Sequence, residues 1–182
     1  MRKIAVTGAT SMIGLATIEE ALNNGDFVYA IVRENSQNLY RLPKSANLKI
    51  IECDISKLKS LPSLINDRCD VFFHIGWGHT GAKRNENALF QVDNLYYILD
   101  AVSAAEMLSC KSFVGAGSQA EYGVLKEKVF TPSTPVNPTT PYGVCKYAAS
   151  RLTIAECEKR KINCIWTRIF SVYGIYNKDT SL

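Results

Sequence analysis

Hydrophobic and polar residues alternate along this chain in blocks that predict a layered α/β fold. Short apolar runs rich in Val and Ile, ended by glycine or polar residues, are typical of strands buried in a parallel sheet. These runs cover residues 3–7, 27–32, 48–53, 70–75, 112–116 and 163–169. Because segments with helical spacing separate them and the connections are short, we expect an open, doubly wound parallel sheet with helices on both faces.

Helical periodicity fills the segments between the expected strands. Asp54 or Ser56 can cap the second helix, and Pro62 interrupts it early. The last two helices both carry apolar stripes, and the polar residues 35–47 predict a loop with a short helix. The expected helices cover residues 13–21, 54–65, 85–108 and 142–161.

Composition is that of an ordinary globular protein with one domain. The chain has 182 residues, of which 47% are hydrophobic and 21% charged, and a net charge of +4 from scattered basic residues. That balance allows one core of good size and gives no nucleic-acid-binding footprint. The apolar run after Met1-Arg2-Lys3 is too short for a signal peptide, and no segment is long enough to cross a membrane. We therefore expect neither nucleic acid nor a membrane as a partner.

The six cysteines show neither a C-x-x-C pair nor the spacing of metal ligands. Several of them lie inside apolar runs, which favours reduced thiols in or near the core of a cytoplasmic protein. We expect no metal site.

Tyr142 and Lys146 stand four residues apart, in sequence that continues as a helix through Leu152. At that spacing both side chains lie on one helix face, about one turn apart. An ammonium near a phenol favours the phenolate, so we expect the pKa of Tyr142 to fall below its usual value of about 10. A phenol tuned in this way can give or take a proton at an alcohol or sugar oxygen. The alternative is a chance pair on a solvated helix face.

A glycine turn between the first strand and the first helix predicts a dinucleotide site. Gly8 permits the tight turn, Gly14 allows close packing of the helix, and Ser11 stands where a third glycine would be expected. The helix N-terminus and the backbone N–H groups of the turn would hold a pyrophosphate.

The end of the second strand carries the residues that would read the adenosine ribose. Arg33 follows this strand and no carboxylate ends it, which favours a 2′-phosphate and therefore NADP over NAD. Glu34 could still reach a ribose hydroxyl, and Arg33 alone could be a surface residue. Asp54, after the third strand, could bind the adenine or only cap its helix.

Seven stretches, in the right order, resemble the extended short-chain dehydrogenases/reductases, and more narrowly the NAD(P)-dependent nucleotide-sugar epimerase/dehydratase family. The resemblance covers essentially the whole chain. The stretches are VTGATSMIG at 6–14, CDI at 53–55, HIGW at 74–77, QVDN at 91–94, FVGAGSQAEYG at 113–123, TPYGVCK at 140–146 and TRIFSVYG at 167–174.

The resemblance implies a catalytic set on a Rossmann domain. Tyr142 would be the acid/base, and Lys146 would lower its pKa and bind the nicotinamide ribose. Ser118, in the loop after the fifth strand, would hold the same substrate oxygen, and Asn94 would support the lysine, often through water. Hydride would pass between a sugar carbon and C4 of the nicotinamide. Taken alone, Ser118 is typical of a turn and Asn94 of an exposed helix face.

The resemblance also implies a cofactor site, a nucleotide-sugar substrate and a homodimer in which helices 85–108 and 142–161 pair across a two-fold axis. The cofactor residues would be Gly8, Thr10, Ser11, Met12, Ile13, Gly14, Arg33, Asp54, Ile55, Tyr142 and Lys146.

Two departures from the family pattern narrow the expected activity. Sugar 4,6-dehydratases carry an Asp-Glu pair directly after the catalytic Ser/Thr, whereas this chain has Gln119 and Ala120 there, and Glu121 comes one residue too late. Epimerization and 4-keto reduction remain open. The sequence given also ends where the family's substrate lobe normally begins, so we expect residues 1–182 to form the NAD(P)-binding domain, with 170–182 as the start of a truncated substrate region. A non-catalytic dinucleotide-binding or redox-sensing protein and a reductase of a non-sugar ketone are the alternatives.

Overall fold

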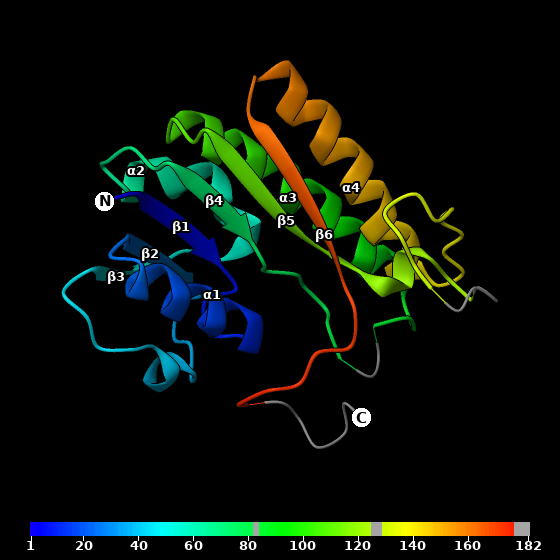
Figure 1. Ribbon diagram of the computed structural model, residues 1–182, viewed down its shortest axis with the longest axis horizontal. Coiled ribbons are helices and arrows are strands. Elements are labelled where there is room, and N and C mark those ends of the chain that lie inside the picture. The colour runs from blue at the N-terminus through cyan, green and yellow to red at the C-terminus, as the bar shows by residue number, and fades with distance from the viewer. Residues whose placement is uncertain (82–83, 125–128, 177–182) are drawn as a thin grey trace.

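The computed structural model describes residues 1–81, 84–124 and 129–176, and these contain a six-stranded sheet in which every pairing is parallel (Figure 1). The strand order is β3-β2-β1-β4-β5-β6, so the direction of winding reverses between β1 and β4. The predicted doubly wound parallel sheet is confirmed. The strands are β1 (Lys3–Thr7), β2 (Phe27–Val32), β3 (Leu48–Glu52), β4 (Val71–His74), β5 (Ser112–Ser118) and β6 (Asn163–Ile169).

The helices follow the predicted order, with one clear difference. Residues 54–65 form two short elements instead of one helix, because Lys57 leaves helical geometry (φ −118°, ψ 18°) and Pro62 lies in the first turn of the next element, where its missing N–H is harmless. The α-helices are α1 (Met12–Asn23), α2 (Leu61–Leu64), α3 (Ala88–Met107) and α4 (Pro141–Lys159), and the 3-10 helices are η1 (Leu39–Arg41), η2 (Ile55–Ser60) and η3 (Gln119–Glu121).

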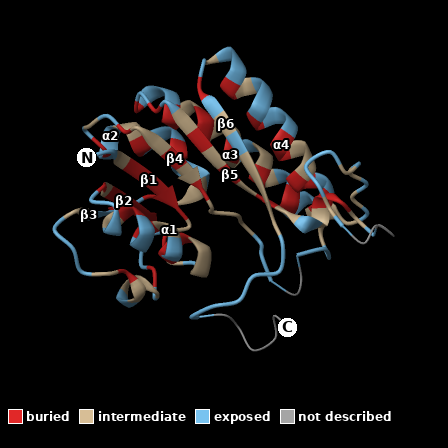
Figure 2. Ribbon diagram, in the orientation of Figure 1, coloured by how far each residue is buried: buried red, intermediate tan, exposed pale blue. Residues whose placement is uncertain are grey.

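Two hydrophobic cores lie on opposite faces of the sheet, and alternate residues of β1 feed them. Ala5 packs in the core that α3 and α4 cover, whereas Ile4 and Val6 pack in the core that α1 covers. Figure 2 accordingly shows buried residues in the strands and in the helices of both layers. The segment after β6 runs along the edge of the sheet at which the strands end (Figure 1).

The buried face of α3 is more polar than its apolar stripe suggested. Gln91 and Asn94 are 0% and 1% exposed, while Leu89 and Tyr96, which belong to the stripe, are 73% and 66% exposed. The two amides can be buried because each is hydrogen-bonded to the loop after β4. Part of the apolar stripe therefore faces outward.

The cysteines are free thiols, five of them buried and one half-buried, as their places in apolar runs predicted. In the described parts of the chain, no helix is long and apolar enough to cross a membrane. The same residues include no group of three or more His, Cys, Asp or Glu that could hold a metal ion.

Candidate active site

The turn after β1 is shaped by two glycines whose surroundings leave no room for a side chain. Gly8 has φ +66°, and a Cβ there would lie 2.8 Å from the Gly76 nitrogen. A Cβ at Gly14 would lie 2.2 Å from the Gly8 carbonyl oxygen. Ser11, at the place of the third glycine, caps α1 by accepting a hydrogen bond of 3.0 Å from the Gly14 N–H. The positive end of α1 is thus held against the end of the sheet, where it suits a diphosphate.

This turn opens onto a cleft of about 780 Å³ along the carboxyl ends of β1 to β4. Doubly wound sheets bind nucleotides at this place, and the volume and the glycine turn fit an extended dinucleotide. Trp77, Gly78 and His79 line one end of the cleft. The predicted cofactor residues that line it are Gly8, Thr10, Ser11, Arg33, Asp54 and Ile55. Met12, Ile13 and Gly14 form the start of α1, while Tyr142 and Lys146 are not among the lining residues.

The residues that the sequence assigned to the adenosine follow β2 and β3, and Arg33 and Asp54 among them line the cleft there. Arg33 is exposed. The pKa of Asp54 is lowered mainly by the cap, because its carboxylate accepts hydrogen bonds from the Ser56 amide and hydroxyl at 2.9 and 2.8 Å. The charges of Lys57 and Arg33 lower this pKa less. Glu34 forms an ion pair with Lys57 at 3.3 Å. Arg41, which the sequence did not single out, lines the same end.

A buried hydrogen-bonded chain joins the first turn to the loop after β4. The Gly76 amide donates to the Thr7 hydroxyl at 3.1 Å, and that hydroxyl lies 3.1 Å from His74 Nδ1. His74 is 2% exposed and stacks on Phe113. Burial, with a smaller effect of the Lys146 charge, lowers the pKa of His74 to about 3, so its ring is neutral.

Tyr142 and Lys146 lie near the start of α4, where Thr140 caps the helix and Pro141 opens it. The Lys146 Nζ donates to the Ala116 carbonyl at 2.6 Å and lies 3.7 Å from the centroid of the Trp77 ring. It lies 5.9 Å from the centroid of the Tyr142 ring. Lys146 is 4% exposed, so the indole and the end of β5 enclose its ammonium.

The expectation that Lys146 lowers the pKa of Tyr142 is wrong for this structure. Burial raises the pKa of Tyr142, while contacts with the Ser118 hydroxyl and the Arg84 charge lower it less. Burial also lowers the pKa of Lys146 to about 7, against an opposing effect of Glu121. The sequence argument assumed a fully charged lysine, but Lys146 is buried and Tyr142 half-buried, and this burial favours the neutral form of each group.

Ser118 is the last residue of β5 and not a residue of the following loop. β5 continues through Gly115 and Gly117. A Cβ at either position would lie within 2.4 Å of the Trp166 indole on β6, so only glycine leaves room for this ring. The Ser118 hydroxyl accepts a hydrogen bond of 3.2 Å from the Ala120 N–H and interacts with the Tyr142 side chain. The structure therefore brings two members of the predicted catalytic set together at the end of β5.

Asn94 holds a loop and makes no direct hydrogen bond to Lys146 in the described structure. Its Oδ1 accepts from the Gly78 N–H at 2.6 Å, and its Nδ2 donates to the Gly78 carbonyl at 3.3 Å. Gln91, one turn earlier, accepts from the Trp77 indole N–H at 2.9 Å. Both amides thus fix the segment that covers the lysine, and a water-mediated role of Asn94 stays a prediction.

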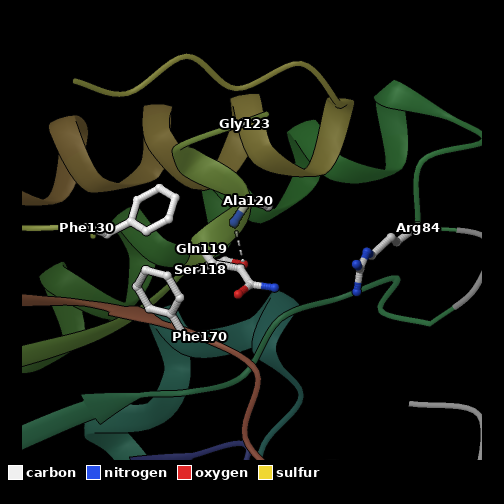
Figure 3. A pocket seen from close by; sticks show the side chains of 7 residues that line it. All are labelled: Arg84, Ser118, Gln119, Ala120, Gly123, Phe130 and Phe170. Carbon is white, nitrogen blue, oxygen red and sulfur yellow. Dashed lines mark hydrogen bonds between the residues drawn. The ribbon is translucent and has the colours of Figure 1, made fainter. Parts of the chain in front are cut away.

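Next to Ser118 is a smaller pocket of about 350 Å³ (Figure 3). Figure 3 shows Phe130 and Phe170 on one side, Arg84 across from them, and Ser118 and Gln119 between. The guanidinium of Arg84 lies 4.8 Å from the centroid of the Tyr142 ring. The pocket therefore offers two aromatic faces, an amide and a cation beside the phenol.

Comparison with known protein families identifies the family of the chain. The sequence model of the NAD dependent epimerase/dehydratase family matches residues 4–182. The chain belongs to this family. The predicted family resemblance is confirmed.

The curated relatives of the chain include both epimerases and dehydratases. The chain is 28% identical over 186 residues to an uncharacterized UDP-glucose epimerase of Bacillus subtilis (strain 168), a match that covers 94% of this chain and 57% of that protein. It is 28% identical over 140 residues to the human dTDP-D-glucose 4,6-dehydratase, with coverage of 76% and 40%. The chain thus spans about half the length of these relatives.

Solved structures show the same fold. A UDP-N-acetylglucosamine 4-epimerase from Methanobrevibacter ruminantium M1, in complex with UDP-N-acetylmuramic acid, superposes with a TM-score of 0.85 at 20% identity, covering 98% of this chain and 58% of that one. A UDP-glucuronic acid 4-epimerase from Bacillus cereus, in complex with NAD, gives 0.76 at 23% identity, covering 94% and 57%. At these identities the likeness establishes the Rossmann-type architecture.

Sequence reasoning missed three side chains that shape the site. Trp77 covers the lysine, Arg84 faces the phenol, and Glu121 lies buried beneath the serine. The tryptophan and the acid stood inside quoted motif stretches, so their positions were available, but no spacing rule indicated what they contact. Arg84 lies in a polar loop without periodicity.

Proposed function

We propose that this chain carries the NAD(P)-binding and catalytic part of an enzyme that oxidises and reduces one carbon of a nucleotide sugar, as an epimerase or a 4-keto reductase. The observation that carries the proposal is the meeting of Ser118 and Tyr142 at the end of β5, beside a cleft of dinucleotide size. The family membership supports NAD(P)-dependent chemistry on such substrates.

The protein residues in this proposal bind the sugar oxygen and move its proton. Bound NAD(P) supplies C4 of its nicotinamide as the hydride acceptor or donor. Tyr142 would take the proton of the sugar hydroxyl when its carbon is oxidised, and Ser118 would hold that oxygen. In an epimerase, Tyr142 would return the proton to the same oxygen once the sugar has presented its opposite face. In a reductase, Tyr142 would instead donate its proton to the ketone oxygen.

Lys146 has to change its contacts to take the role that the family resemblance implies. Its ammonium now faces Trp77 and the Ala116 carbonyl, and its low pKa follows from that enclosure. Next to a nicotinamide ribose and a forming phenolate, the ammonium would gain hydrogen bonds and an opposite charge, and its charged form would be favoured again.

We propose NADP as the preferred cofactor, with NAD as the alternative. Arg33 is exposed at the mouth of the cleft, and Arg41 lines the same region. A guanidinium suits the 2′-phosphate that distinguishes NADP from NAD. One structural neighbour of the chain was solved with NAD, so the preference is to be measured on this chain itself.

The pocket beside Tyr142 supports a nucleotide-sugar substrate. Phe130 and Phe170 offer apolar faces for a sugar ring, Gln119 offers an amide, and Arg84 offers a cation for a phosphate or carboxylate group. Dehydration is disfavoured because Gln119 and Ala120 cannot expel water as acids, although several relatives are dehydratases. We further propose that residues 1–182 act as the cofactor domain and that 170–182 begin a substrate region, of which 177–182 lie outside the described residues.

We also propose a cytoplasmic homodimer. Leu89, Val92 and Tyr96 on α3, with Val144 and Leu152 on α4, leave apolar side chains at the surface of two adjacent helices. A second copy would bury them in a four-helix arrangement, as the resemblance implies. Sedimentation should show a dimer at micromolar concentration, which Tyr96→Glu disrupts; a monomeric unmodified chain would overturn this part.

Replacement of Tyr142 by Phe tests the function. Incubation with each oxidised and reduced cofactor and a panel of UDP-, dTDP- and GDP-sugars should show turnover for the unmodified chain. In Tyr142→Phe, turnover should fall about 10³-fold with cofactor affinity within about twofold, since general acid–base catalysis contributes on the order of 10²–10⁴. Equal turnover in the two proteins would overturn the assignment.

Two other functions would show themselves in the same experiment. The enclosure of Lys146 by Trp77 is the observation that favours a non-catalytic dinucleotide-binding or redox-sensing protein. Such a protein would bind the cofactor and turn over no substrate. Turnover of non-sugar ketones alone would indicate a ketoreductase.

A further inference from the structure

Glu121 is a fully buried carboxylate directly beneath the proposed catalytic serine. It is the last residue of η3 and is 0% exposed. Its Oε1 accepts hydrogen bonds from the Ser118 N–H at 2.8 Å and from the Trp166 indole N–H at 3.0 Å, and its Oε2 accepts from Arg168 Nε at 3.0 Å. The acid therefore ties the serine on β5 to two residues of β6.

The neighbouring residues leave a space that fits this carboxylate. A Cβ at Gly117 would lie 2.4 Å from Glu121 Oε1 and 2.3 Å from Trp166 Nε1, so a side chain at position 117 would displace the acid or the indole. Arg168 is itself fixed, because its Nη1 donates to the Tyr122 hydroxyl at 3.2 Å and its guanidinium lies 4.8 Å from the centroid of the Tyr122 ring.

A buried ion pair of this kind contributes little to the net free energy of unfolding. Desolvation of the two charges offsets most of their attraction, and apolar residues of similar volume are often as stable or more stable. Glu121 is fully hydrogen-bonded, so it is tolerated, but stability alone does not explain why an acid lies at this point of the site.

The charge of Glu121 acts on both titrating members of the catalytic set. It raises the pKa of Lys146 and that of Tyr142, both on α4, and Arg168 from β6 is its ion-pair partner. His74 faces Lys146 from β4, and its neutral ring adds no charge. Arg84 faces Tyr142 from the loop before α3 with the opposite effect.

We propose that Glu121 is a positioning residue, which fixes Ser118 through its backbone N–H and places a buried negative charge next to the catalytic set. This inference rests on the proposed function for the assignment of Ser118, Tyr142 and Lys146 as the catalytic set. Glu121 itself touches neither the substrate nor the reacting atoms.

The first test measures Lys146 without any substrate. In Glu121→Gln, the amide oxygen still accepts from the Ser118 amide and the indole, but the negative charge is gone. The double variant Glu121→Gln/Arg168→Gln replaces the ion pair by an amide pair, so it folds even where a lone buried arginine does not. The titration of the Lys146 side chain is followed by its ¹³Cε signal in NMR spectra, assigned with Lys146→Arg.

The titration midpoint of Lys146 should fall by on the order of one pH unit in Glu121→Gln against the unmodified chain, and in the double variant against Arg168→Gln, because each of these comparisons changes only the charge of Glu121. The matched control is Glu106→Gln, which removes an acid from an exposed pair with Arg160 and should leave the midpoint unchanged. A midpoint in the double variant equal to that of Arg168→Gln would overturn the electrostatic part of the proposal, whatever the enzyme's activity.

The second test is the pH dependence of turnover on an accepted nucleotide sugar. Loss of Glu121 should move the whole profile to lower pH, because both Lys146 and Tyr142 lose the charge that raises their pKa. It should also reduce kcat on the order of tenfold through misplacement of Ser118, with the KM for cofactor unchanged.

The outcomes separate the two proposals. A purely structural role would lower the profile without moving it, and that result would overturn the inference. A shifted Lys146 titration in a chain that turns over no substrate would instead overturn the proposed function and leave the charge effect of Glu121 standing.

Discussion

The proposed cofactor cleft lies along the carboxyl ends of β1 to β4, whereas the proposed substrate pocket lies beside the end of β5, and the two are built in different ways. The cleft of about 780 Å³ is shaped mainly by backbone, with Gly8, Gly76 and the start of α1 in close contact. The pocket of about 350 Å³ is shaped by side chains from separate segments, namely Arg84, Gln119, Phe130 and Phe170 (Figure 3).

This difference determines which region binds every substrate complex in the same way and which region distinguishes one sugar from another. A diphosphate is the same in every dinucleotide, so a fixed turn and a helix terminus suffice to bind it. Sugars differ by single hydroxyl or carboxyl groups, and only exchangeable side chains can distinguish them. Substitutions in the cleft should therefore affect every substrate alike, whereas substitutions in the pocket should affect some substrates more than others.

The largest effect is expected from Gly14→Ala. The new Cβ would lie 2.2 Å from the Gly8 carbonyl oxygen, so the turn has to open. Overpacking of this kind costs about 1–3 kcal/mol, and we expect calorimetry to show a loss of cofactor affinity up to about 100-fold.

Gly25→Ala is the matched control for that substitution. Gly25 has φ +76°, and a Cβ at this position would meet nothing within 4 Å, so only backbone strain is added. It should lower the melting temperature slightly and leave cofactor affinity unchanged. Equal affinity in the Gly14 and Gly25 variants would contradict the idea of a cleft shaped by backbone contacts.

Arg84→Ala should affect the substrate pocket alone. Loss of a charge-assisted hydrogen bond of about 1.5–3 kcal/mol should lower kcat/KM for a nucleotide sugar about 30-fold, with cofactor affinity unchanged. Arg68→Ala, at an exposed position away from the site, is the control. Comparison of neutral sugars with uronic acids shows whether Arg84 binds the diphosphate or a sugar carboxylate, because only the second case gives unequal losses.

Arg33→Ala should change cofactor choice by a smaller factor. Loss of one guanidinium at the mouth of the cleft should weaken NADPH binding about tenfold and leave NADH binding unchanged. Titration of each cofactor by calorimetry measures the ratio. Tighter binding of NADH than of NADPH by the unmodified chain would show that the end of β2 was misread.

The last prediction concerns the pH dependence of stability beneath the cleft. The pKa of buried His74 is about 3 in the folded chain, below the unfolded value of about 6.5. The unfolded chain therefore binds the extra proton as pH falls from about 6.5 toward 3, and the free energy of unfolding should fall by up to about 1.4 kcal/mol per pH unit from this residue.

Denaturant unfolding at several pH values checks this expectation. His74→Phe keeps a ring against Phe113 but cannot titrate, so its stability should vary less with pH over that range. His79→Gln, at an exposed position, should keep the slope of the unmodified chain. Identical slopes in all three proteins would show that His74 is protonated in the folded state.

The sequence predicted the fold and the glycine turn after β1 because both follow from local rules. Apolar runs gave the six strands within a few residues, and Gly8 and Gly14 occupy the sterically restricted places expected of them. The end of β5 was placed two residues early, because Gly115 and Gly117 weaken the strand pattern while they make room for Trp166 across the sheet.

The electrostatics of the site could not be predicted in the same way. The spacing of Tyr142 and Lys146 indicated their common helix face, but their pKa values depend on burial and on Glu121, which comes from another segment. Asn94, taken alone, likewise had the pattern of an exposed helix face, but the loop after β4 supplies its hydrogen-bond partners. Such long-range contacts leave no periodic signal along the chain.

The enclosure of Lys146 by Trp77 has an optical consequence. An ammonium 3.7 Å from an indole ring centroid perturbs the fluorescence of that indole, and a ligand that draws the lysine away would change its emission. The other tryptophan of the chain, Trp166, donates to the Glu121 carboxylate under the serine. With Trp166→Phe, the emission of Trp77 alone would report on the lysine, and with Trp77→Phe the remaining signal would report on the buried acid.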